Sequence, residues 1–258
     1  MTLIETHCHL DYLKQLTTAE IIKKAQENGV EKFITISVEP DNLCKVIELT
    51  KQFKNVYCSQ GIHPHDAKLA SDEVLSIIKE NTLKEKKVVA LGEMGLDYHY
   101  NNSPKDIQIE YFEKQLKLAC ELNKPVVIHT RDADDDTISI LKKYSAKLKH
   151  KGVLHSFTSG KKLAEFALSE GFYLGFNGII TFKNAQNVRE IVELTPIERL
   201  LIETDSPFLA PVPHRGSENA PFHLPLVAAK IAEIKNISVE AVAKQSTKNA
   251  TDLFQFLI

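Results

Sequence analysis

Eight short apolar runs, separated by stretches of helical periodicity, constrain the fold of this chain more than any other feature. The runs are rich in β-branched residues, which favours strands, whereas the stretches between them repeat apolar residues at the spacing of a helix face. The predicted strands are Leu3–His9, Lys32–Val38, Val56–Ile62, Val88–Leu96, Pro125–His129, Gly152–Phe157, Phe172–Ile179 and Leu200–Glu203. The predicted helices are Thr17–Asn28, Asp41–Gln52, Ser71–Glu80, Asp106–Leu122, Asp135–Lys147, Lys161–Glu170, Asn184–Glu193, Leu224–Lys235 and Val239–Phe256.

Regular alternation of strand and helix predicts a parallel sheet, which can close into a barrel or stay open. Eight units in 258 residues match a (β/α)8 barrel, which typically has about 250 residues. A doubly wound open sheet is the alternative, but it uses fewer strands and usually has a glycine-rich turn after the first strand. Here Leu10-Asp11-Tyr12 follows the first strand. We therefore expect an α/β chain folded as one (β/α)8 TIM barrel domain over residues 1–258.

Composition indicates an ordinary intracellular protein. No apolar run reaches the roughly 18 residues that a membrane span needs, and the N-terminus shows no basic-then-apolar signal segment. The four cysteines, Cys8, Cys44, Cys58 and Cys120, form no C-x-x-C pair, so reduced structural thiols are expected. We expect a cytoplasmic monomer without a membrane partner.

The net charge of −2 gives no support to nucleic-acid binding, because domains that bind duplex DNA usually carry a basic surface. Bound divalent cations could nevertheless supply positive charge locally. Charge therefore leaves a nucleic-acid substrate open.

Polar side chains gather where the predicted strands end. In a barrel of this type the active site lies at the C-terminal ends of the strands. Seven imidazoles and carboxylates fall at or just after such ends: His7, His9, His63, Glu93, His129, His155 and Asp205. This convergence predicts a metal-binding site at the mouth of the barrel.

The first strand ends in two histidines that are two residues apart. His7 and His9 should point the same way from a strand, so both can reach one ion while Cys8 points away. A buried imidazole pair without an ion or a charged partner would be destabilising. Glu93, in Gly92-Glu93-Met94-Gly95, is expected to bridge two ions.

Three further residues complete the predicted ligand set. His129 and His155 each follow an apolar run, although a histidine there could also be a polar plug in the barrel top. Asp205 precedes Ser206-Pro207; it could form an Asx turn, or it could bind an ion and accept a proton from the attacking water. We favour the ligand role for all three, and we expect Asp205 and Glu93 to be catalytic.

The predicted ligands are His7, His9, Glu93, His129, His155 and Asp205. Nitrogen and oxygen donors suit Zn²⁺ and Mn²⁺, and carboxylates with water molecules also suit Mg²⁺. Six ligands exceed what one zinc ion normally takes, so we expect two divalent ions about 3.5–4 Å apart.

Other polar residues near the motifs are candidates for substrate binding. The chain has 4 arginines against 28 lysines, and Arg131 and Arg215 both lie beside motif residues. Their planar forks suit phosphate oxygens, although a structural salt bridge is the alternative. His63 is expected to contact a substrate phosphate or leaving group. His65 could lie in the site or on its rim, and Asp97 and Glu203 could support ligands or shape loops.

An acidic run follows the fifth predicted strand. It contains Asp132, Asp134, Asp135 and Asp136. We interpret it as a helix start, since carboxylates are favoured at the positive end of a helix dipole.

The motifs together closely resemble the TatD family of metal-dependent deoxyribonucleases, in the amidohydrolase-like superfamily. The resemblance runs from Ile4 to the C-terminal helix. Five segments carry it: Thr6-His7-Cys8-His9-Leu10-Asp11, Gly61-Ile62-His63-Pro64-His65, Gly92-Glu93-Met94-Gly95-Leu96-Asp97-Tyr98, His129-Thr130-Arg131-Asp132-Ala133 and Glu203-Thr204-Asp205-Ser206-Pro207. It implies a metal site on the same six residues and hydrolysis of DNA phosphodiester bonds with Mg²⁺ or Mn²⁺, often from a 3′ end of single-stranded DNA.

Two segments depart from the family pattern. Glu5 stands where the family usually has aspartate, and the loop from Pro213 to Pro221 has fewer basic residues than the pattern. Some relatives are described as D-aminoacyl-tRNA deacylases, so an ester or amide substrate is the first alternative to DNA. The second is a metal-binding scaffold without catalytic activity.

Overall fold

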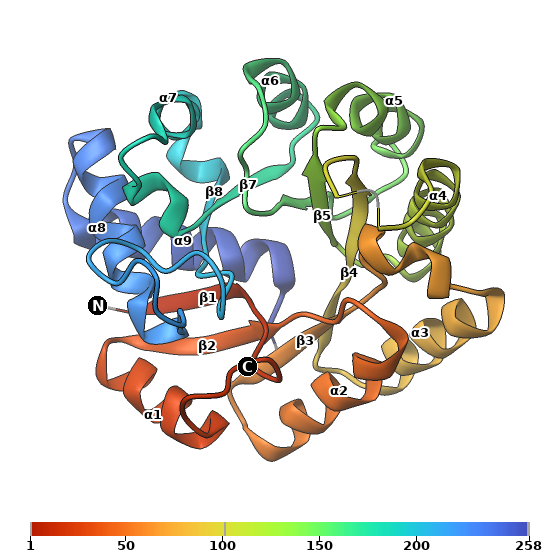
Figure 1. The fold of residues 1–258 in the computed structure, drawn as a ribbon, viewed down its shortest axis with the longest axis horizontal. Helices are drawn as coiled ribbons and strands as arrows, with labels where there is room; N and C mark the ends of the chain where they lie inside the picture. Colours follow the sequence, from red (N-terminus) through yellow and green to blue (C-terminus); the bar gives the residue numbers. More distant parts are fainter. Residues whose placement is uncertain (1, 101, 257–258) are drawn as a thin grey trace.

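Eight parallel strands form a ring that is surrounded by helices (Figure 1). The computed structural model describes residues 2–100 and 102–256. The strands are β1 (Leu3–Cys8), β2 (Val30–Thr35), β3 (Val56–Gln60), β4 (Val88–Asp97), β5 (Val126–Arg131), β6 (Gly152–Leu154), β7 (Tyr173–Phe176) and β8 (Leu200–Ile202). They pair in sequence order, which confirms the (β/α)8 TIM barrel and rules out a doubly wound sheet.

The ring closes between β1 and the segment that follows β8. Cys8 and Ser206 form a parallel bridge. On either side of it, the amide of Asp205 donates to the carbonyl of His7 at 2.9 Å, and the amide of His9 donates to the carbonyl of Ser206 at 2.8 Å. Closure therefore brings the first and last motifs of the chain side by side.

The nine predicted helices each have a counterpart among the described residues. They are α1 (Thr18–Glu27), α2 (Leu43–Gln52), α3 (Asp72–Lys84), α4 (Lys105–Leu122), α5 (Asp134–Tyr144), α6 (Lys161–Ser169), α7 (Gln186–Leu194), α8 (Leu224–Lys235) and α9 (Val239–Phe254). Capping side chains mark helix starts, as at α1. There Thr17 accepts a hydrogen bond from the amide of Glu20, and the carboxylate of Glu20 accepts one from the amide of Thr17. Within the described ranges, none of these helices combines the length and apolarity of a membrane span.

Several of the predicted strands are shorter than expected, β6 and β7 most of all. β6 ends at Leu154, and β7 ends at Phe176, where the run to Ile179 was predicted to continue. The Asn177 side chain accepts a hydrogen bond from the amide of Ile179 and starts the short 3₁₀ helix η3 (Gly178–Thr181). The apolar run therefore leaves the sheet while remaining in the interior.

The end of the barrel opposite the predicted site is filled by the C-terminal helix. Phe254 and Phe256 pack with Tyr57 and Val89, which lie near the starts of β3 and β4. The rings of Tyr57 and Phe256 are 4.8 Å apart. A cavity for a substrate is therefore expected at the other end of the barrel, where the strands finish.

Gly95 provides a test of how β4 packs against β5. Its φ is +146°, and a Cβ atom there would overlap the carbonyl oxygen of His129. Backbone strain of about 1–3 kcal/mol and forced repacking of about 1–3 kcal/mol should together lower the free energy of unfolding of Gly95→Ala by about 4 kcal/mol, measured by urea denaturation. Gly216→Ala is the control, because Gly216 has φ +87° but nothing within 4 Å of an added Cβ. Equal losses in the two variants would contradict this packing.

Candidate metal centre

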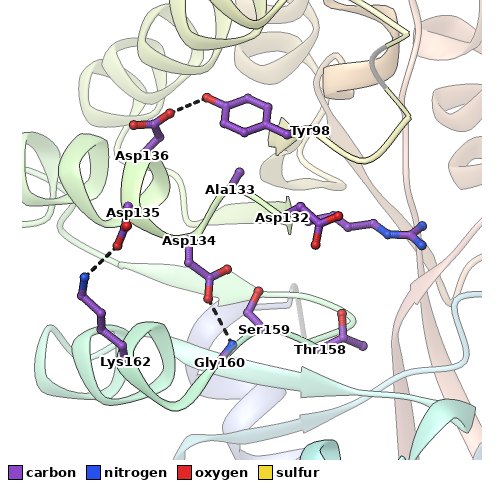
Figure 2. A pocket seen from close by; sticks show the side chains of 11 residues that line it. Tyr98, Asp132, Ala133, Asp134, Asp135, Asp136, Thr158, Ser159, Gly160 and Lys162 are labelled. Carbon is purple, nitrogen blue, oxygen red and sulfur yellow. Dashed lines mark hydrogen bonds and ion pairs between the residues drawn. The ribbon is translucent and has the colours of Figure 1, made fainter.

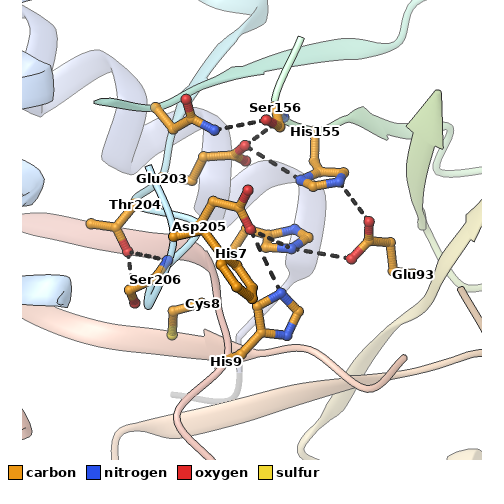
Figure 3. Close-up of polar contacts among 12 residues, drawn as sticks. His7, Cys8, His9, Glu93, His155, Ser156, Glu203, Thr204, Asp205 and Ser206 are labelled. Carbon is orange, nitrogen blue, oxygen red and sulfur yellow. Dashed lines mark hydrogen bonds and ion pairs between the residues drawn. The ribbon is translucent and has the colours of Figure 1, made fainter. Parts of the chain in front are cut away.

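The six predicted ligands meet at the C-terminal ends of the strands. Glu93 Oε2 lies 3.3 Å from His7 Nε2, and Glu93 Oε1 lies 2.7 Å from His155 Nε2. Asp205 Oδ1 is 3.6 Å from Nε2 of both His7 and His9. Figure 3 shows these side chains turned toward one another, while Cys8 points away and donates to the carbonyl of Ile34.

Glu93 is the hub of the cluster. Besides His7 and His155, its carboxylate faces His129, with Oε1 3.1 Å from Nδ1, and His63, with Oε1 3.3 Å from Nε2. Three groups of residues could each hold an ion, because within each group the potential ligand atoms lie within 4.8 Å of one another. The groups are His7, Glu93 and His155; His7, His9 and Asp205; and His63, Glu93 and His129. Glu93 belongs to two of them, which is the arrangement that a bridging carboxylate needs.

The surroundings of the His7 ring show whether the cluster suits a metal ion. Its residue exposure is 1%, and within the described chain neither ring nitrogen has a hydrogen-bond partner. Buried polar atoms are normally hydrogen-bonded, so a bare nitrogen facing two carboxylates fits a divalent cation. Burial, together with the positive charge of His155, lowers the pKa of His7, which favours the neutral ring that binds metals.

The carboxylates of the cluster are held in their ionised form. Burial by itself would raise the pKa of Glu93, but the charge of His155 and hydrogen bonds from His129 and His155 bring it well below its usual value. The pKa of Asp205 is likewise lowered, because the hydrogen bond from His9 and the charge of His155 outweigh burial. Both side chains can therefore bind a cation at neutral pH.

Two carboxylates lie behind the histidines. Asp97 Oδ2 is 3.0 Å from His129 Nε2 and 3.0 Å from His65 Nε2, and Asp97 Oδ1 accepts the amide of Tyr100. Asp97 thus supports both a candidate ligand and the loop after β4, and His65 lies in the site. Glu203 Oε1 is 3.6 Å from His155 Nδ1. Such partners orient metal-binding histidines.

Glu5 has a structural role that the sequence analysis missed. Its Oε1 accepts hydrogen bonds from the amides of His7 and Thr204, each at 3.0 Å, and so links β1 to the residue preceding Asp205. The side chain is fully buried, and this burial raises its pKa to about 8. The available signal was a glutamate directly after the apolar pair Leu3-Ile4 in a predicted strand.

The predicted substrate-binding residues separate into two groups. His63 and Arg131 line a cavity of about 670 Å³ that also contains the metal cluster. Burial lowers the pKa of His63 to about 4, so its ring is neutral. Arg215 is outside this lining; its guanidinium stacks on the ring of Phe182 at 3.7 Å.

Comparison with known proteins then identifies the family. The family model described as TatD related DNase matches residues 4–255. The chain belongs to the TatD family. The Bacillus subtilis protein named uncharacterized metal-dependent hydrolase YabD is 42% identical over 98% of this chain and 99% of its own. The Erwinia amylovora protein named 3′-5′ ssDNA/RNA exonuclease TatD is 35% identical over 91% and 92%.

Solved structures agree with this assignment. The crystal structure of YJJV, a TatD homologue from Escherichia coli K12, matches with a TM-score of 0.93 and 29% identity over 99% of this chain and 98% of that one. The predicted resemblance is therefore confirmed, and the chain is a metal-dependent hydrolase of the TatD family.

In this TatD-family hydrolase the acidic run borders a second cavity, of about 690 Å³, that shares Arg131 and Thr158 with the first. Figure 2 shows how its carboxylates pair: Asp134 accepts the amide of Gly160, Asp135 contacts Lys162, and Asp136 accepts the hydroxyl of Tyr98. α5 starts at Asp134, as the helix-start interpretation predicted.

Proposed function

We propose that this TatD-family barrel hydrolyses phosphodiester bonds of single-stranded DNA from the 3′ end, using two divalent ions. The observation that carries the proposal is the buried set of four histidines and two carboxylates around Glu93, beside Arg131. The name of the Erwinia relative, a 3′-5′ ssDNA/RNA exonuclease, supports the substrate class. We further propose that residues 1–258 act as one domain and that the protein works as a monomer.

The six predicted ligands would hold the ions, with Glu93 shared between them. Mg²⁺ or Mn²⁺ suits the carboxylates, and Zn²⁺ suits the four histidines. When bound, such ions polarise a phosphoryl oxygen and make water a better nucleophile.

The chain's own groups would do the rest. Asp205 is ionised and can accept the proton of the attacking water. Arg131 offers its planar fork to the phosphate oxygens, and the neutral ring of His63 can contact the leaving group. Arg215, farther from the cluster, would contact a more distant phosphate of the strand.

The test is cleavage by metal-stripped protein of a single-stranded oligonucleotide labelled at its 5′ end, with Mg²⁺, Mn²⁺ or Zn²⁺ added separately. We expect metal-dependent shortening from the 3′ end that is lost in His129→Ala. His150→Ala is the matched control, because His150 lies beside Gln255 at the opposite end of the barrel. Metal binding without cleavage by any ion would refute the proposal and direct the search to aminoacyl-tRNA and other ester or amide substrates.

A further inference from the structure

A large aromatic side chain stands uncovered at the mouth of the metal centre. Phe208 is 51% exposed, yet it lines the same cavity as the metal cluster, and its ring centroid is 6.1 Å from that of His9. An aromatic ring exposed at the mouth of a cavity offers a flat apolar face to a ligand that enters it.

The backbone of Phe208 is held firmly while its ring is left free. Its amide donates to the carbonyl of Asp205 at 2.9 Å, and its carbonyl accepts from the side chain of Asn219 at 2.7 Å. The backbone that carries the ring is therefore fixed three residues beyond a candidate ligand. Tyr100, also exposed at the mouth, differs because the guanidinium of Arg131 already lies 4.8 Å from its ring centroid.

The two segments that extend the lining of this cavity outward differ in charge. The acidic side, residues 131–136, begins at the shared lining residue Arg131 and carries four aspartates that border the second cavity. The basic side, residues 177–185 and 206–217, includes the lining residues Ile179, Phe208 and Leu209. It contains no aspartate or glutamate and carries Lys183 and Arg215, both exposed. These two loops are joined, because the amide of Val212 donates to the hydroxyl of Thr181 at 2.9 Å.

We propose that the nucleic-acid strand leaves the metal centre over Phe208, with a base stacked on its ring, and continues toward Arg215 and Lys183. The inference rests on the proposed function and adds the path of the substrate. A polyanion is attracted to the basic side and repelled by the aspartates. Aromatic platforms combined with a basic track are how proteins bind single strands without strong sequence preference.

The test compares steady-state cleavage of the labelled oligonucleotide by variants of the metal-loaded protein. Phe208→Ala should raise KM by about 5- to 100-fold, the range expected for one lost base stack, while metal content and melting temperature stay unchanged. Phe208→Tyr should restore KM because it keeps the ring, and Phe208→Leu should not. Val212→Ala is the matched control, since Val212 is 48% exposed in the same loop but lies outside the cavity lining.

Substitutions of charged residues test the proposed path of the nucleic-acid strand. Arg215→Ala should raise KM and reduce the slope of log affinity against log salt by about one, whereas Asp132→Asn on the acidic side should leave KM within twofold. An unchanged KM in Phe208→Ala, or full rescue by leucine, would overturn the stacking role. A larger effect of Asp132→Asn than of Arg215→Ala would overturn the path. Wild-type protein that cleaves no oligonucleotide would overturn the proposed function, and this inference with it.

Discussion

Replacing Asp205 with asparagine should lower turnover of a single-stranded oligonucleotide by about 10²- to 10⁴-fold while the barrel stays folded. Asparagine has the same shape, so the backbone bonds from the Asp205 amide to His7 and from the Phe208 amide to residue 205 can persist. The amide cannot accept a proton as the carboxylate does, and it is a weaker partner for a cation and for the rings of His7 and His9.

The measurement is kcat at saturating metal, together with thermal unfolding of the metal-free protein. Asp252→Asn on α9 is the matched control, because that carboxylate pairs only with Lys248 on the exposed surface in the described structure. A variant at position 205 with wild-type kcat would remove Asp205 from the mechanism. A large fall in melting temperature would instead assign the loss to folding.

The fold was predictable because burial leaves a periodic signature in the sequence, and that signature is local. Local periodicity does not reveal the places where a side chain redirects the backbone. Ile179 and Ile180 continue the apolar run of β7, but the cap supplied by Asn177 turns them into a 3₁₀ helix. α2 begins at Leu43, two residues later than expected, because the Asn42 side chain accepts the amides of Val38 and Glu39 and holds a separate turn.

The convergence of the predicted ligands was predictable because a barrel converts strand ends into neighbours. Residues whose role depends on partners from other strands were harder to predict. Asp97 meets His65 and His129 only after three strands have closed up, since each pair is 32 residues apart. Arg215 lies in the long segment between β8 and α8, so no strand end fixes its place, and it contacts Phe182 outside the cavity lining.

Replacing Glu93 with glutamine should reduce bound metal to at most one ion and lower turnover by at least about 1000-fold. The carboxylate faces histidine nitrogens on both sides, with Oε2 toward His7 and Oε1 toward His63, His129 and His155. An amide is neutral and keeps one strong oxygen donor. It therefore offers an anionic partner to neither side of the cluster, and its one oxygen can face only one of them.

Two readouts separate this effect from that of Asp205→Asn. Elemental analysis after dialysis against Mn²⁺ or Zn²⁺ reports the number of ions held, and oligonucleotide cleavage reports turnover. Glu80→Gln on α3 is the matched control, since Glu80 is exposed and pairs with Lys84. If Glu93 is shared between two ions, its loss reduces the metal content as well as the rate. A Glu93→Gln protein that retains two ions would show that the histidines and Asp205 hold both ions without a bridging carboxylate.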